Sequence, residues 1–284
     1  MFGLLRRCGS VARSRWRVIA GCLAIAIGPS VLAQSDLETK LAEQLRVELK
    51  SQFGTAQQLN AAITRTYGVR LSAEKEEIAR DALRAFMLNE AVPLYIAKLL
   101  APVYRPDLTS KELASAVVEG IAQMQVKGLA RLPAARQAAF VSYMVSMLNA
   151  IRASDCKALL EGRLDTNASA ALERRYIASL PPDRFEAVTN LYKEASEAEL
   201  AGYPDPRYLN PSQAQLAEKV YETASTKRLR ERFPAAVLQR VTKGGDVAPA
   251  SEVCLVMTET FASMLDMAEP YKAWQLTRFM QSMQ

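Results

Sequence analysis

The chain has 284 residues, with 36 lysines and arginines against 30 aspartates and glutamates, and it contains no histidine. Histidine is the usual general base near neutral pH and a common metal ligand, so its absence excludes Ser-His-Asp and Cys-His catalytic sites and histidine-based zinc sites. The formal net charge of +6 would suggest a nucleic-acid partner only if the positive charge were clustered on the folded part of the protein.

Residues 1–33 predict a cleavable secretory signal peptide. Residues 1–17 hold five arginines and no acid, and residues 18–33 are almost wholly apolar. A basic segment followed by a short apolar segment and small residues at a cleavage site defines such a signal. Val31-Leu32-Ala33 fits a cleavage site, so we expect the mature chain to begin at Gln34 after cleavage at Ala33.

A lipobox at Ile19-Ala20-Gly21-Cys22 is the alternative, and it would make Cys22 a lipidated first residue. A lipobox must follow the apolar segment, whereas most of the apolar residues here come after Cys22. We therefore predict cleavage near Ala33 and a periplasmic or secreted protein. The apolar run is shorter than the roughly 20 residues that span a bilayer, and we expect no transmembrane segment in the mature chain.

Cleavage would remove most of the basic charge. The five arginines leave with the signal, so the mature chain carries 6 − 5 = +1. The densest basic run, Lys227–Arg232, is interrupted by Glu231, and such a run is typical of a solvated helix face. We therefore expect no nucleic-acid partner.

Two cysteines, Cys156 and Cys254, remain after Cys8 and Cys22 are removed. In an exported protein two cysteines most simply form one disulfide. The alternative is a reactive thiol, because each cysteine follows an expected helix start, where the helix dipole lowers a thiol pKa. No C-x-x-C motif and no histidine base accompany either one.

Residues 34–284 predict an all-α fold: a compact multi-helix domain of about ten helices with little or no β-structure. Apolar residues recur at a period close to 3.6, as at Met257, Phe261 and Met264, and such stripes face the core of globular helices. Strand-like alternation is absent from the sequence. The expected helices, several of them short or merging, span residues 36–53, 56–67, 73–88, 90–101, 110–127, 134–153, 155–161, 168–180, 184–201, 213–231, 235–242, 252–268 and 271–283.

Helix starts and stops carry recognisable local signals. Ser212-x-x-Gln215 predicts a capping box, and Ser72 predicts an N-cap, because such side chains accept hydrogen bonds from the first turn. Glycines that follow helical patterns, such as Gly128 and Gly202, predict helix ends. Pro93 is expected to kink a long helical segment or to split it.

The domain prediction is a single all-helical domain over residues 34–284, with a candidate joint at 202–212. That segment, GYPDPRYLNPS, contains three prolines and two tyrosines. Tyrosine and arginine are favoured at binding hot spots, so Tyr203, Arg207 and Tyr208 form a candidate interaction loop. The loop around Asp246 is a second candidate, and a solvent-facing connector is the alternative for both.

No catalytic, cofactor or metal site is predicted. Two cysteines are too few for a thiolate zinc or iron–sulfur site. Ser72-x-x-Lys75 and Ser154-x-x-Lys157 have the spacing of a serine–lysine nucleophile. The S-D-N and K-T-G elements that penicillin-recognising enzymes also need are missing.

Paired carboxylates are the remaining catalytic option, because a glycan hydrolase works with two acids and no histidine. The acids near apolar faces are Glu119, Glu161, Asp165 and Glu259. The sequence does not show which of them would meet across a cleft.

The segment Val92–Val117, VPLYIAKLLAPVYRPDLTSKELASAV, resembles the tyrosine and T-x-x-E-L segment of a group of uncharacterised exported helical proteins of bacteria. The aromatic-Ser-Pro motif that follows in that group is absent after Val118. The resemblance implies no activity.

The sequence thus leads us to expect an exported helical protein that acts by protein–protein binding. An inhibitor, an immunity-type partner or an accessory factor of the envelope would fit, and the partner would be another envelope or exported protein. The alternative is a histidine-free two-carboxylate hydrolase of envelope glycan.

Overall fold

The computed structural model describes residues 34–102, 104, 110–244 and 247–284. The predicted signal peptide, including Ala33, lies outside these residues, and Gln34 is the first residue of the first described helix. Within the described part the chain forms thirteen helices and no strand. The predicted all-α class is confirmed, and the number of helices exceeds the expected ten because short helices stay separate.

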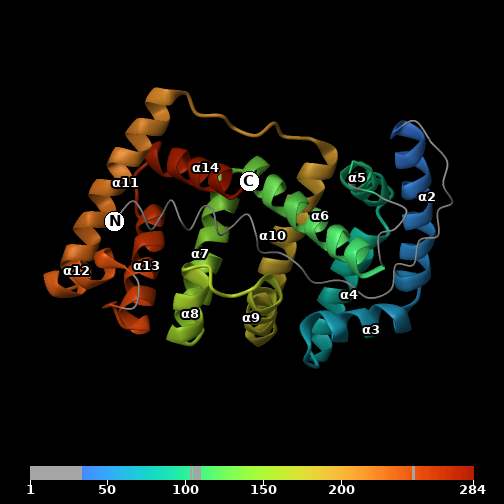
Figure 1. Ribbon diagram of the computed structural model, residues 1–284, viewed down its shortest axis with the longest axis horizontal. Coiled ribbons are helices and arrows are strands. Elements are labelled where there is room, and N and C mark those ends of the chain that lie inside the picture. The colour runs from blue at the N-terminus through green and yellow to red at the C-terminus, as the bar shows by residue number, and fades with distance from the viewer. Residues whose placement is uncertain (1–33, 103, 105–109, 245–246) are drawn as a thin grey trace. The chain divides into compact units, whose positions relative to one another are not determined.

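Figure 1 labels the helices α2 to α14 in chain order. Their bounds are α2 Gln34–Phe53, α3 Ala56–Tyr67, α4 Ala73–Met87, α5 Ala91–Leu100, α6 Ser110–Arg131, α7 Ala134–Ala150, α8 Ala153–Leu160, α9 Thr166–Ser179, α10 Pro182–Ala201, α11 Pro211–Arg232, α12 Ala235–Lys243, α13 Ala250–Leu265 and α14 Tyr271–Met283.

The break between α4 and α5 precedes Pro93 rather than coinciding with it. Helix α4 ends at Met87, and the Asn89 side chain accepts a hydrogen bond of 2.9 Å from the backbone N–H of Ala91, where α5 begins. Pro93 lies in the first turn of α5. A proline is tolerated there, because the N–H that it lacks would have no partner within the helix.

The structure corrects one predicted helix start and confirms another. Helix α11 begins at Pro211, and its capping box joins Asn210 to Gln213 rather than Ser212 to Gln215. Proline is favoured at the first helical position, which moves the cap two residues earlier. Ser72 caps α4 as predicted and accepts from the N–H of Lys75.

Of the two glycines named above as predicted helix ends, the structure confirms Gly202 and contradicts Gly128. Gly202 ends α10 in the left-handed conformation, with a φ of 64°, which glycine adopts without strain. Gly128 lies inside α6, so its prediction as a helix end was wrong. A Cβ atom at Gly128 would overlap the carbonyl oxygen of Ala195 on α10, and the glycine therefore permits a close approach of these two helices.

The described residues fall into two compact units. The N-terminal unit comprises the chain up to Gly128 and Ile177–Tyr203, and the C-terminal unit comprises Leu129–Tyr176 and Pro204–Gln284. The chain passes from one unit to the other between Tyr203 and Pro204, inside the segment 202–212. That residues 34–284 form a single domain with a joint at 202–212 remains a prediction.

Each unit has its own hydrophobic core. In the N-terminal unit α2 packs against α5, and Leu41, Leu45 and Ile96 are fully buried. In the C-terminal unit α13 packs against α7, α8, α11, α12 and α14. The predicted apolar stripe of α13, including Met257 and Phe261, lies in that core.

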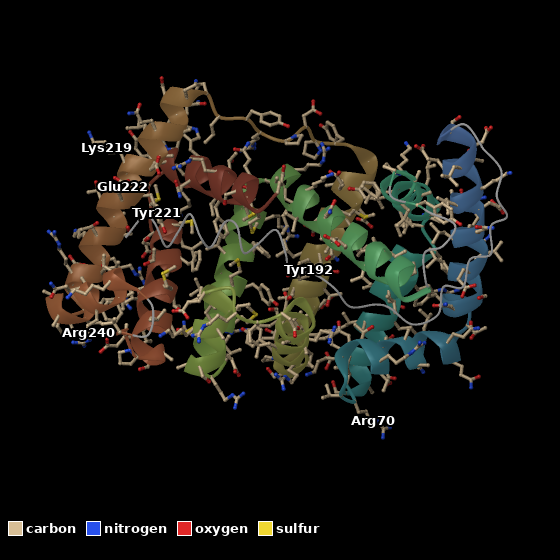
Figure 2. All side chains as sticks on the ribbon, in the orientation of Figure 1. Arg70, Tyr192, Lys219, Tyr221, Glu222 and Arg240 are labelled. Atoms are coloured by element: carbon tan, nitrogen blue, oxygen red, sulfur yellow. A yellow bond between two sulfur atoms is a disulfide. The ribbon has the colours of Figure 1, made fainter. Side chains whose placement is uncertain are left out.

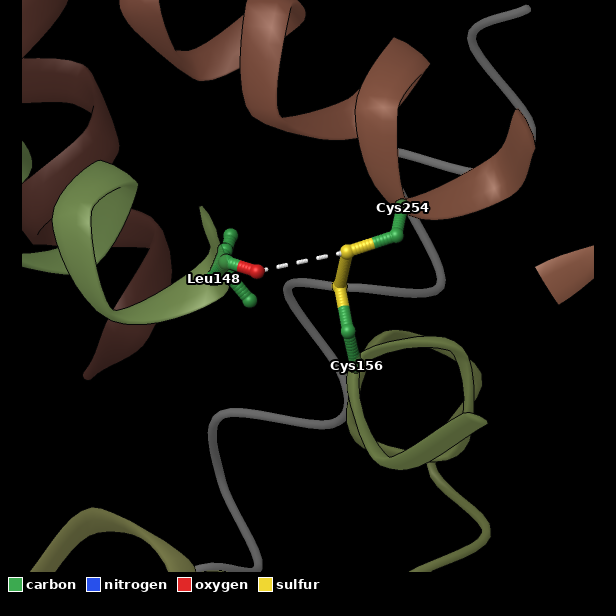
Figure 3. Close-up of a disulfide and its surroundings, with 3 residues drawn as sticks. All are labelled: Leu148, Cys156 and Cys254. Carbon is green, nitrogen blue, oxygen red and sulfur yellow. Dashed lines mark hydrogen bonds between the residues drawn. A yellow bond between two sulfur atoms is a disulfide. The ribbon is translucent and has the colours of Figure 1, made fainter. Parts of the chain in front are cut away.

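The predicted disulfide between Cys156 on α8 and Cys254 on α13 is present, with a Cα–Cα distance of 5.8 Å (Figure 3). Both cysteines are buried, and the Cys254 sulfur lies 3.4 Å from the carbonyl oxygen of Leu148. Both belong to the C-terminal unit. The loop that the bond closes nevertheless contains Ile177–Tyr203 of the N-terminal unit.

Candidate interaction surface

The candidate interaction surface lies on Pro204–Asn210, the segment of the C-terminal unit that leads into α11 (Figure 1). Tyr208 is 80% exposed, and Tyr203, the last residue of the N-terminal unit, is 76% exposed. No other large hydrophobic residue in the described part of the chain is as exposed as these two. Both tyrosines predicted for the interaction loop are therefore at the surface.

Two side chains of the C-terminal unit hold the backbone of this segment. Arg131, at the end of α6, donates from Nη1 to the carbonyl oxygen of Pro204 over 3.1 Å. Gln281 on α14 donates from Nε2 to the carbonyl oxygen of Arg207 over 2.7 Å. Because these bonds reach main-chain acceptors, they order the segment without using its own side chains.

The side chains of the segment divide into an inner and an outer set. Pro206 and Leu209 are half-buried, whereas Asp205, Arg207 and Tyr208 are exposed. Among the described residues, no partner takes up the Tyr208 hydroxyl or the Arg207 guanidinium. These two groups are available to an external ligand.

The second predicted loop is only partly within the described residues, and Asp246 lies outside them. After it, Val247 is 59% exposed and Ala248 is buried. The Lys157 ammonium on α8 donates to the Ala248 carbonyl oxygen over 2.9 Å. This end of the loop is therefore fixed to the same unit through α8.

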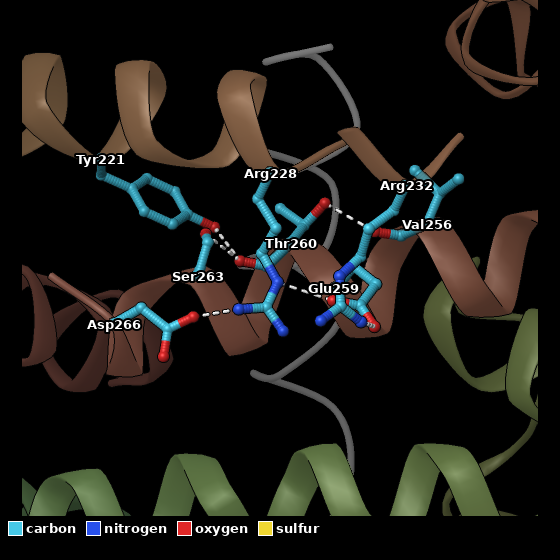
Figure 4. Close-up of polar contacts among 8 residues, drawn as sticks. All are labelled: Tyr221, Arg228, Arg232, Val256, Glu259, Thr260, Ser263 and Asp266. Carbon is cyan, nitrogen blue, oxygen red and sulfur yellow. Dashed lines mark hydrogen bonds and ion pairs between the residues drawn. The ribbon is translucent and has the colours of Figure 1, made fainter. Parts of the chain in front are cut away.

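Helices α11 and α13 are joined by a polar network (Figure 4). Glu259 pairs with Arg228 and with Arg232, each over 2.6 Å, and Arg228 also pairs with Asp266. The Tyr221 hydroxyl donates to the Thr260 carbonyl oxygen over 3.0 Å. Arg228 and Arg232, two arginines of the run Lys227–Arg232, thus form ion pairs with Glu259 and are not simply solvated.

A second ion pair joins α12 to α13. Arg240, labelled with Tyr221 in Figure 2, donates to both carboxylate oxygens of Glu252, over 3.0 Å and 2.5 Å. This hydrogen bonding lowers the pKa of Glu252 and raises the pKa of Arg240. Together with the Glu259 network it supports the scaffold of the C-terminal unit that carries Pro204–Asn210.

The acids considered for hydrolysis have structural contacts. In the C-terminal unit, Glu161 pairs with Arg163 over 2.6 Å, and Asp165 accepts from the N–H of Ala168 over 2.8 Å at the start of α9. Glu259 bridges two arginines, as above. Among the described residues, none of these three bonds to another carboxylate, and Glu119 lies in the N-terminal unit on α6.

Both Ser-x-x-Lys lysines are engaged elsewhere. The Lys75 ammonium donates to the carbonyl oxygens of Ala178 and Leu180, over 2.8 Å and 2.9 Å, and Lys157 reaches Ala248. Within the residues that the structure describes there is no group of acids and cysteines that could hold a metal ion. No helix among them is long and apolar enough to cross a bilayer.

Sequence reasoning did not identify Arg131 and Gln281. Each lies more than seventy residues from the carbonyl that it binds, with separations of 73 and 74 residues. Neither residue has a local sequence signal, because each hydrogen bond joins parts of the chain that meet only in the folded protein.

Comparison with known proteins finds no family model, no curated protein and no solved structure that matches this chain. The resemblance of Val92–Val117 to exported helical proteins thus has no family match behind it, and residues 103 and 105–109 of that stretch lie outside the described residues.

Proposed function

We propose that the mature chain is a periplasmic protein that binds another envelope or exported protein, as an inhibitor, an immunity-type partner or an accessory factor. The observation that carries this proposal is Tyr208, exposed on a segment whose backbone is tied to the C-terminal unit. Tyrosine and arginine are enriched at binding hot spots. A segment that is already ordered loses less conformational entropy when a partner binds.

The proposed location has two supports of different kinds. Residues 1–33 have the composition of a signal peptide. The disulfide between Cys156 and Cys254 is of the kind that forms and persists in oxidising compartments such as the periplasm. Both support an exported protein.

The contacts of the carboxylates favour binding over hydrolysis. A two-carboxylate hydrolase needs one acid with a raised pKa close to a second carboxylate. Glu161 pairs with Arg163, and Glu259 pairs with Arg228 and Arg232, so both carboxylates already have arginine partners. The contacts of Glu161 and Glu259 therefore support a structural role for these two carboxylates.

The experiment is affinity capture from envelope extract. The mature chain, residues 34–284, is immobilised through a C-terminal tag, and captured proteins are identified and quantified by mass spectrometry. We expect a protein partner that wild type captures and that Tyr208→Ala captures at least tenfold less, since truncation of a hot-spot residue costs about 2 kcal/mol or more.

Val47→Ala is the matched control, because Val47 is 60% exposed on α2 in the N-terminal unit. Its capture should equal that of wild type. If the Tyr208→Ala and Val47→Ala proteins capture the same partners equally well, the proposed surface is wrong. If no protein is captured while the extract's glycan is degraded, the binding function is wrong and the glycan hydrolase is supported.

A further inference from the structure

The segment Pro204–Asn210 has little conformational freedom even before its contacts are considered. Pro204 and Pro206 each have a fixed φ. Asp205 and Asn210 precede prolines, which disfavours the helical region at both residues and favours extended or polyproline II conformations. Only Arg207, Tyr208 and Leu209 are locally unrestricted.

The contacts of the segment repeat every third residue. The two carbonyl groups held by the C-terminal unit belong to Pro204 and Arg207, and the two half-buried side chains are those of Pro206 and Leu209. Asn210 has φ −69° and ψ 161°. A polyproline II helix has three residues per turn, no internal hydrogen bonds and dihedral angles near these values.

We infer that Pro204–Asn210 is a preformed polyproline II ligand, and that its partner is a folded protein with an aromatic-lined groove for this conformation. This inference rests on the proposed function and names the partner class. Aromatic-lined grooves recognise such segments because the conformation is already formed before binding. One face of the segment is held by Arg131 and Gln281, so the opposite face is the one that docks.

The docking face defines what the groove must contain. Tyr208 presents an aromatic ring with a free hydroxyl, and Arg207 presents a guanidinium without a partner among the described residues. The groove therefore needs an apolar wall for the ring and a carboxylate for the arginine, which binds carboxylates through two parallel hydrogen bonds. Indole or phenol donors on the wall would bind the outward carbonyl groups of the segment.

The conformation is tested on the mature protein without any partner. NMR chemical shifts of Arg207, Tyr208 and Leu209 should fall in the extended, polyproline II range, and their heteronuclear NOE values should match those of α11. Gln281→Ala should lower these NOE values, because it removes the donor to the Arg207 carbonyl oxygen. Random-coil chemical shifts and low heteronuclear NOE values for these three residues in the wild-type protein would overturn the inference.

Recognition is tested by competition in the capture experiment. The probe is a peptide of residues 202–212, compared with one in which Pro204 and Pro206 are glycine and with one carrying Tyr208→Ala. We expect the native peptide to displace the captured protein at a concentration at least tenfold lower than either variant. The same substitutions in the full chain, checked for native helix content, should weaken capture to a similar degree.

The outcomes separate this inference from the proposed function. If Tyr208→Ala abolishes capture but the proline-to-glycine changes have no effect, the protein binds through Tyr208 and the polyproline II inference is wrong. If Tyr208→Ala leaves capture intact, the proposed surface itself fails. Tyr208-dependent binding to purified envelope glycan, with no captured protein, would contradict the inference that the partner is a protein.

Discussion

At Tyr208 the chain exposes 80% of an aromatic side chain on a backbone that Gln281 holds at the preceding residue. An exposed tyrosine on a mobile loop would lose conformational entropy when it docks. Here much of that loss has already occurred on folding, which favours binding. The same reasoning identifies Gln281 and Arg131 as the residues that order the segment through its backbone carbonyl groups.

Gly128 is a residue whose role is steric. Gly128→Ala places a Cβ atom against the carbonyl oxygen of Ala195, so α6 and α10 must move apart. We expect the free energy of unfolding to fall by about 1–3 kcal/mol, the usual cost of overpacking, as measured by urea denaturation.

The matched control for Gly128→Ala is Gly120→Ala in the same helix, where the Cβ meets only the end of the Leu99 side chain. This neighbour can move, so the loss should be smaller. Equal stability of wild type and Gly128→Ala would contradict the close approach of α6 and α10.

Glu252 predicts a pH dependence with a definite sign. Hydrogen bonding to Arg240 lowers the pKa of Glu252 from its ordinary value of 4.5. A carboxyl whose folded pKa is lowered contributes stability above its unfolded pKa and loses it as the pH falls through the folded pKa. Glu252→Gln should therefore be less stable than wild type at pH 7, and the difference should shrink as the pH falls below 4.5.

The measurement for Glu252 is the urea midpoint of both proteins between pH 7 and pH 3. Glu269→Gln is the control, because that acid accepts a hydrogen bond from a backbone N–H and has no ion pair among the described contacts. A Glu252→Gln difference that is constant over the whole pH range would show that the ion pair with Arg240 contributes nothing.

At the scale of elements, α11 and α13 pack through apolar residues and are joined at their polar edge by Glu259. The arginines that it binds are separated by four residues, so both lie on one face of α11. A single carboxylate can then bridge them. The arrangement fixes the C-terminal half of α11, the helix that Pro204–Asn210 enters.

Glu259→Gln keeps the shape of this bridge and removes its charge. We expect the free energy of unfolding to fall by about 1 kcal/mol, since Arg232 is partly exposed and solvent screens the pair. Thermal unfolding in low and high salt checks this value, and the difference from wild type should decrease at high salt. A salt-independent difference would mean that the bridge acts through packing rather than charge.

Most elements could be predicted because their signals are local. Apolar spacing and caps such as Ser72 lie within a few residues of the helices that they define. One failure has a local cause and the other a long-range cause. Pro211 displaced the cap of α11 from Ser212 to Asn210, and Gly128 was interpreted as a stop although the close approach to Ala195 explains it.

The candidate surface was predictable only in part. Prolines and tyrosines identified the segment 202–212, because composition alone marks an irregular stretch rich in hot-spot residues. The donors Arg131 and Gln281, and the pairing of Glu259 with two arginines, depend on tertiary packing between distant helices. A sequence without an alignment contains no sign of such contacts.

At the scale of the whole molecule, two units with separate cores share one chain that passes between them more than once. The disulfide links α8 to α13 within the C-terminal unit, 98 residues apart. Such a cross-link restricts the unfolded chain over a long loop. It therefore stabilises the C-terminal unit most directly.

The double change Cys156→Ser and Cys254→Ser should lower the free energy of unfolding by about 2–5 kcal/mol. The buried positions of both cysteines also predict slow reduction of the native protein by dithiothreitol, with fast reduction once it is unfolded in urea. Thiol titration with and without urea measures both rates. Equal rates in the two states would contradict the burial of the bond.

The central claim is that this protein binds another envelope protein through the exposed face of Pro204–Asn210. The most direct measurement is quantitative capture from envelope extract by wild type, Tyr208→Ala and Val47→Ala in parallel. The account predicts one or more proteins that wild type and Val47→Ala retain equally and that Tyr208→Ala retains at least tenfold less. Equal retention by all three proteins, or no retained protein at all, would contradict it.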